Sequence, residues 1–181
     1  MNFKFDIRFT DKDYLDYNTF WLLKSPYGKM QTSKVRKMIY VIFGIGALLI
    51  LLLTGMSIQS YVSIGALVIL CALFQLFANR FFLLSLKFQI KAMKKSGKMT
   101  YSAEAVMEFS EKTFTETTPE NKSELKYSSI ERVSIVGGKF IYIHINNLMA
   151  YMLPFDSFES VEEYNKFFDF IKTKVDVVDI Y

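Results

Sequence analysis

The side chains that most often carry enzyme chemistry are sparse and isolated in this 181-residue sequence. His144 is the single histidine, and its strand-like surroundings place it on an outer face, where a lone histidine is usually structural or solvated. Cys71 is the single cysteine, which excludes an intramolecular disulfide and a thiolate metal cluster. No phosphate-binding glycine loop, nucleophile elbow or paired-histidine zinc motif occurs. We therefore expect no catalytic residue, cofactor site or metal site.

Basic side chains form the one group whose spacing suggests binding. They flank a long apolar stretch on both sides, where lysine and arginine attract anionic lipid headgroups by about 1 kcal/mol each. The predicted headgroup contacts are Lys34, Arg36, Lys37, Lys87, Lys91, Lys94, Lys95 and Lys98.

The apolar stretch, residues 38–78, contains no Asp, Glu, Lys, Arg or His. A helix needs roughly 20 residues to cross a hydrocarbon core of about 30 Å, so one helix of this length would be about twice too long. The most polar part, residues 54–60, is the expected turn. We predict a two-helix transmembrane hairpin over residues 38–82, with spans near 38–56 and 61–82.

The charges around the hairpin predict its orientation. Lysines and arginines precede the first span and follow the second, whereas the connecting loop has none. The positive-inside rule then predicts a multi-pass protein of the cell membrane, with two spans and with both termini in the cytoplasm. Because residues 38–78 hold no charged residue, we interpret the hairpin as an anchor and not as an ion path.

The remaining chain divides into three predicted parts. Residues 1–37 hold a strand with alternating apolar side chains at 2–9 and an amphipathic helix at 11–24. The strand needs a sheet, either in the later domain or in a partner. The aromatic face of the helix lies either in the membrane interface or against the cytoplasmic domain. Residues 83–98 are predicted to form a basic juxtamembrane helix, and residues 99–181 a cytoplasmic β-rich domain.

Residues 99–181 show the pattern of an α+β domain. Strands are expected at 100–109, 113–118, 123–127, 130–136, 139–145 and 148–153, with Gly137-Gly138 as a two-residue hairpin turn. Ser160 and Glu163 form a capping box that begins a helix through Ile171. The predicted fold is an antiparallel strand meander closed by one C-terminal helix.

The formal charge of +4 is unevenly distributed. Residues 100–181 carry eight Lys and Arg against fourteen Asp and Glu, which is −6, whereas residues 35–99 carry eight basic residues and no acid. A nucleic-acid-binding domain would place its basic stripe on the folded part. This distribution favours the bilayer as the anionic partner and argues against nucleic acid.

Several short segments resemble the bacterial YcxB-like membrane protein family. They are Phe9 to Leu15, Tyr127 to Val133, Tyr142, and Leu153 to Phe158 before a Glu-rich helix, in a chain with two membrane helices. The resemblance implies a cytoplasmic domain similar to bacterial pleckstrin-homology-like (PH-like) domains. It implies no established activity and no catalytic residues.

Two functions follow as expectations. The first is a non-enzymatic membrane protein that holds a PH-like interaction domain at the inner membrane face and binds a partner protein or a second copy of itself. The alternative is a sensor of anionic lipid headgroups that uses the juxtamembrane basic segment. A transporter or enzyme has the least support from the residues.

Overall fold

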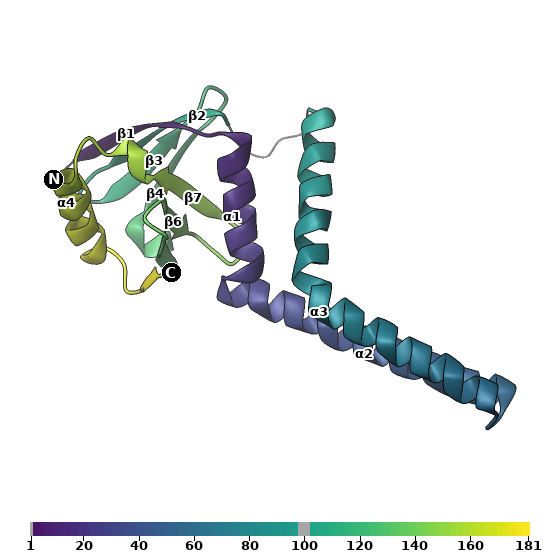
Figure 1. Ribbon diagram of the computed structural model, residues 1–181. Helices are drawn as coiled ribbons and strands as arrows, with labels where there is room; N and C mark the ends of the chain where they lie inside the picture. The colour runs from purple at the N-terminus through teal and green to yellow at the C-terminus, as the bar shows by residue number, and fades with distance from the viewer. Residues whose placement is uncertain (1, 98–101) are drawn as a thin grey trace. The chain divides into compact units, whose positions relative to one another are not determined.

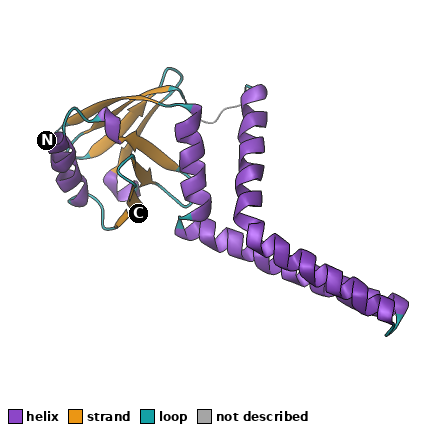
Figure 2. Cartoon of the chain, in the orientation of Figure 1, coloured by secondary structure: helices purple, strands orange, loops and turns teal. Residues whose placement is uncertain are grey.

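The computed structural model describes residues 2–97 and 102–181, so the predicted domain start at residue 99 lies outside the described residues. The chain divides into two compact units, Met1–Tyr14 with Thr100–Tyr181 and, separately, Leu15–Met99. The strands drawn in orange in Figure 2 belong to the first unit, which we call the sheet unit, and the second is helical. The helices are α1 (Asp11–Leu23), α2 (Pro26–Thr54), α3 (Ile58–Lys95) and α4 (Val161–Lys172). The strands are β1 (Phe3–Arg8), β2 (Glu104–Phe109), β3 (Thr113–Thr117), β4 (Lys122–Lys126), β5 (Arg132–Val136), β6 (Phe140–His144), β7 (Ala150–Pro154) and β8 (Val178–Ile180).

The helical unit is built on the hairpin of α2 and α3, which lie side by side in Figure 1. The turn falls inside the predicted segment, at Gly55 with a φ of 65°, a conformation that glycine adopts without steric cost. Ser57 then begins α3 through a capping box with Ser60, whose hydroxyl also donates to the Gly55 carbonyl at 2.7 Å. The predicted juxtamembrane helix is the continuous extension of α3 to Lys95.

Both hairpin helices are long and apolar enough to span a membrane. Their uncharged parts, from Met38 to Thr54 and from Ile58 to Ala78, are about 25 Å and about 31 Å long at 1.5 Å per residue. These lengths match a hydrocarbon core of about 30 Å. Only 0% and 11% of their most apolar windows are buried.

A tight corner joins α1 to α2. Ser25 precedes α2, where its hydroxyl accepts a hydrogen bond from the Gly28 amide at 3.0 Å and donates to the Trp21 carbonyl at 2.5 Å. Pro26 occupies the first turn of α2, where its missing N–H is not needed. Gly28 is buried, and a Cβ atom at this position would lie 1.9 Å from the Trp21 carbonyl oxygen. The corner therefore requires glycine at this position.

The first sheet has the strand order β1-β2-β3-β4, all antiparallel neighbours. The N-terminal strand β1 pairs with β2 over its whole length, from Phe3 opposite Phe109 to Arg8 opposite Glu104. This pairing answers the question left open by the sequence, because the strand joins the later sheet of its own chain. Phe3, Phe5 and Ile7 face inward and are buried, as their alternation predicts.

The second sheet has the strand order β7-β6-β5-β8. Gly137 and Gly138 have φ values of 55° and 61°, and the Lys139 amide donates to the Val136 carbonyl at 3.0 Å. The predicted glycine turn is present, with positive φ at both glycines, but the register pairs Val136 with Phe140, so three residues and not two connect β5 to β6. The strands therefore form two sheets and not the single meander that was predicted. After the final helix, β8 pairs in parallel with β5, so the second sheet is mixed. The sequence prediction contained no strand after the helix.

The final helix α4 packs its aromatic side chains into the core between these strands. Ser160 begins the helix as predicted, since its hydroxyl accepts from the Glu163 amide at 3.1 Å. Figure 1 shows α4 beside the start of β1, and the Phe167 ring lies 5.3 Å from that of Phe3 and 4.8 Å from that of Phe109. The predicted helices, strand-rich C-terminal region and final helix are confirmed.

Candidate functional site

The predicted headgroup contacts lie on two helices of the helical unit. Lys34 and Lys37 are exposed on α2, and Arg36 between them is half-buried. The four lysines of the C-terminal part of α3 are exposed, namely Lys87, Lys91, Lys94 and Lys95. Lys98 lies outside the described residues. The structure therefore separates one partly buried arginine from a set of exposed lysines.

Arg36 is held where the polar end of the hairpin meets its apolar part. Its Nη2 donates to Oδ1 of Asn79 on α3 at 2.8 Å. Gln75, one turn earlier on α3, donates from Nε2 to the Arg36 backbone carbonyl at 3.4 Å. These bonds join α2 to α3 immediately before the uncharged stretch that begins at Met38.

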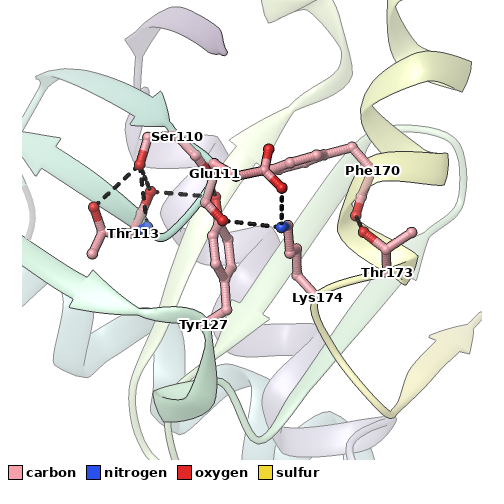
Figure 3. Close-up of polar contacts among 7 residues, drawn as sticks. All are labelled: Ser110, Glu111, Thr113, Tyr127, Phe170, Thr173 and Lys174. Atoms are coloured by element: carbon pink, nitrogen blue, oxygen red, sulfur yellow. Dashed lines mark hydrogen bonds and ion pairs between the residues drawn. The ribbon is translucent and has the colours of Figure 1, made fainter. Parts of the chain in front are cut away.

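A polar cluster ties the end of the chain to the turn between β2 and β3 (Figure 3). Lys174, after α4, donates from Nζ to the Glu111 carbonyl at 3.0 Å and to its carboxylate at 2.8 Å. This hydrogen bond lowers the pKa of the Glu111 carboxyl. The Tyr127 hydroxyl donates to the Ser110 carbonyl at 2.8 Å, and burial raises the pKa of this phenol. Both groups keep their ordinary charge at pH 7, so the cluster is a structural clasp and contains no activated base.

His144 is not on a solvated face, which corrects the sequence prediction. The residue is 1% exposed, and its Nε2 lies 3.1 Å from the Ser134 hydroxyl on the neighbouring strand. Burial, together with the nearby Arg132 charge, lowers the pKa of the His144 imidazole to about 4. The side chain is therefore neutral at pH 7. All five residues of β6 are buried, so both faces of this strand are covered.

Arg132 is a buried charge that sequence reasoning missed. It is 8% exposed and stands opposite His144 in the pairing of β5 with β6. Its Nη1 lies 3.8 Å from the Glu131 carboxylate, whereas its Nε and Nη2 have no hydrogen-bond acceptor among the described residues. An arginine in an alternating strand would ordinarily be placed at the surface, so no sequence signal identified it.

The histidine makes folding stability depend on pH. Its folded pKa lies below the ordinary value of 6.5, so the unfolded chain binds the proton more readily and stability falls as pH drops from 6.5 toward 4. At 1.36 kcal/mol per pH unit, the loss amounts to about 3 kcal/mol. We expect His144→Gln, which keeps a polar group near Ser134, to remove this part of the slope. Denaturant unfolding of both proteins at pH 7 and pH 4.5 measures this change in the free energy of unfolding. An equal change in the two proteins would contradict the burial argument.

Within residues 2–97 and 102–181, no group of three or more His, Cys, Asp and Glu side chains is arranged to hold a metal ion. The polar groups that the structure brings together are the Arg36 pair on the hairpin, the clasp around Lys174, and the buried Arg132 and His144.

Comparison with family models gives a match over the sheet unit. Residues 109–171 match the model of the family described as YcxB-like protein, which covers about a third of the chain and runs from the end of β2 to the end of α4. The resemblance stated from the sequence is confirmed over this segment. No curated protein matches the chain, and no solved structure matches it.

Proposed function

We propose, from the YcxB-like segment and the exposed apolar hairpin, that this chain is a membrane protein that holds its sheet unit at the cytoplasmic face of the cell membrane. The observation that carries the proposal is the exposure of the apolar side chains of α2 and α3. A core helix of a water-soluble protein would bury such a surface, because its exposure to water costs about 25 cal/mol per Å². Lipid removes that cost.

The charges support an orientation with both ends of the chain in the cytoplasm. The turn at Gly55 carries no charge, whereas basic side chains gather at the opposite ends of both helices. Such asymmetry is typical of the cytoplasmic side of a membrane protein.

The role proposed for the sheet unit is non-enzymatic binding of a partner protein through a PH-like domain. Two four-stranded sheets with one helix packed on their core support the PH-like assignment. The charge of −6 on residues 100–181 repels this unit from anionic lipid and favours a partner with a basic surface. His144, which is buried and neutral, is assigned to packing within the second sheet.

Reporter fusions and crosslinking test this proposal. Reporters at both termini should give cytoplasmic signals and a reporter at Ser57 an extracytoplasmic one, while the protein resists alkaline extraction from membranes. Crosslinking in native membranes should then recover the same partner or a self-oligomer repeatedly. An extracytoplasmic terminus would overturn the orientation, and repeated recovery of neither species would overturn the partner-binding role.

Sensing of anionic lipid is the second candidate, and the exposed lysines of α3 favour it. Replacing Lys87, Lys91, Lys94 and Lys95 together with glutamine removes four charges beside the membrane. If binding of the reconstituted protein to soluble anionic lipid is unchanged, this role is excluded.

A further inference from the structure

A polar cavity lies where three helices of the helical unit meet. It has a volume of about 250 Å³ and lies within the unit Leu15–Met99. Its lining residues are Leu23, Lys29, Thr32, Ser33, Arg36 and Asn79. The four residues from α2 stand at positions i, i+3, i+4 and i+7, so they share one face of that helix. Leu23 comes from α1 and Asn79 from α3, which makes the cavity a product of the fold and not of one helix surface.

Arg36 is a charged group of this cavity whose hydrogen-bonding capacity is only partly used. Asn79 accepts from Nη2 at 2.8 Å, which fixes the plane of the guanidinium. Nε is buried and has no acceptor among the described residues, and no carboxylate there forms an ion pair with Arg36. A buried donor left without an acceptor costs about 1–3 kcal/mol, and more when the group is charged. An anion beside Arg36 would balance its charge, which no carboxylate among the described residues does.

The other lining groups also favour an anion. Lys29 is exposed and, among the described residues, forms no ion pair. The Thr32 hydroxyl donates to the Gly28 or Lys29 carbonyl. The Ser33 hydroxyl has no hydrogen bond in the described part of the chain and can donate to a ligand. Asp16 is the only acidic residue in the sequence from 15 to 99. The cavity thus presents two cations and a hydroxyl, with no competing carboxylate in its lining.

We propose that this cavity binds a phosphate group, and that the headgroup phosphate of a membrane lipid supplies it. The guanidinium of Arg36 offers the planar fork that suits phosphate oxygens, and Lys29 adds a point charge. Arg36 is two residues before Met38, where the uncharged stretch begins, and this is the depth of lipid headgroups if α2 spans the membrane. The lipid source therefore rests on the proposed function.

Native mass spectrometry of the full chain, released from membranes in mild detergent, tests the site. The probes are phosphatidylglycerol, diacylglycerol, which has the same tails and no phosphate, and inorganic phosphate. Arg36→Gln and Lys29→Gln should each weaken retention of phosphatidylglycerol by about tenfold or more, the effect of losing a charge-assisted hydrogen bond. Lys12→Gln and Lys24→Gln remove the same charge from exposed positions outside both the cavity and the predicted headgroup contacts, and should change retention less than about twofold.

Each outcome decides the question. If only the two cavity variants lose phosphatidylglycerol, and diacylglycerol is not retained by any protein, the result supports a lipid phosphate. If inorganic phosphate binds the unsubstituted chain but not Arg36→Gln, and no lipid is retained, the result supports a phosphate site with a soluble source. Equal losses in all four variants, or no binding of either phosphate probe, overturn the site. Alkaline extraction of the same proteins separates the two proposals: a chain that stays in the membrane without binding phosphate refutes only the cavity. If Arg36→Gln does not fold, Lys29→Gln carries the same comparison.

Discussion

Replacing Gly28 with alanine is expected to destabilise the corner between α1 and α2 by about 3 kcal/mol or more, the upper range for overpacking. The new Cβ atom would lie 1.9 Å from the Trp21 carbonyl oxygen and 2.7 Å from that of Leu22. Both are backbone atoms, so a side-chain rotation cannot relieve the overlap. The substitution must displace α1 from the start of α2 and break the hydrogen bond between the Gly28 amide and Ser25.

Trp21 provides the measurement, because it is the only tryptophan in the chain and lies at this corner. Its emission in the purified protein should shift, and its thermal transition should move to a lower temperature. Gly44→Ala is the matched control, since Gly44 is also on α2 and nothing lies within 4 Å of its added Cβ atom. Equal behaviour of the two variants would contradict the proposed overlap.

The second large effect is expected at Phe167 on α4. This side chain is fully buried, and its ring lies within 6 Å of those of Phe3, Phe5, Phe109 and Phe158. Truncation to alanine leaves a cavity among aromatic neighbours that cannot all move together, at a typical cost of about 3–5 kcal/mol. Because β1 and α4 both contribute to this cluster, the N-terminal strand should loosen as well.

Hydrogen exchange in the sheet unit measures this effect. Protection of β1 and β2 amides should fall together in Phe167→Ala. The neighbouring Phe168→Ala is the control, because Phe168 is only partly buried and stacks on Tyr164 at the edge of the core. Loss of protection confined to α4 would show that β1 does not depend on this cluster.

Local chemistry made part of this fold predictable. Gly137 and Gly138 specify a turn through their positive φ values, and Ser160 specifies a helix start by accepting from the amide three residues on. The division of the apolar stretch followed from its length, and the place of the turn from the polarity of residues 54–60. These signals need no knowledge of distant contacts.

The remainder depends on tertiary contacts that one sequence does not contain. The alternation of Phe3, Phe5 and Ile7 indicates a strand, but nothing local identifies β2 as its neighbour. At three residues, β8 is too short to show a period. His144 was predicted on an outer face and Gly28 was not singled out, because the burial of both residues comes from other elements. The candidate cavity likewise needs Leu23 and Asn79 beside α2.

The pairing of β1 with β2 has a consequence for how the chain is made. About one hundred residues, including both hairpin helices, separate the two strands in the sequence. At roughly 5–20 residues per second of synthesis, β1 emerges about 5–20 s before its neighbour. Throughout that interval Phe3, Phe5 and Ile7 have no sheet to cover them, while the apolar helices are already leaving the ribosome. β1 is therefore synthesised well before the strand that pairs with it, and its apolar face needs shelter until β2 arrives.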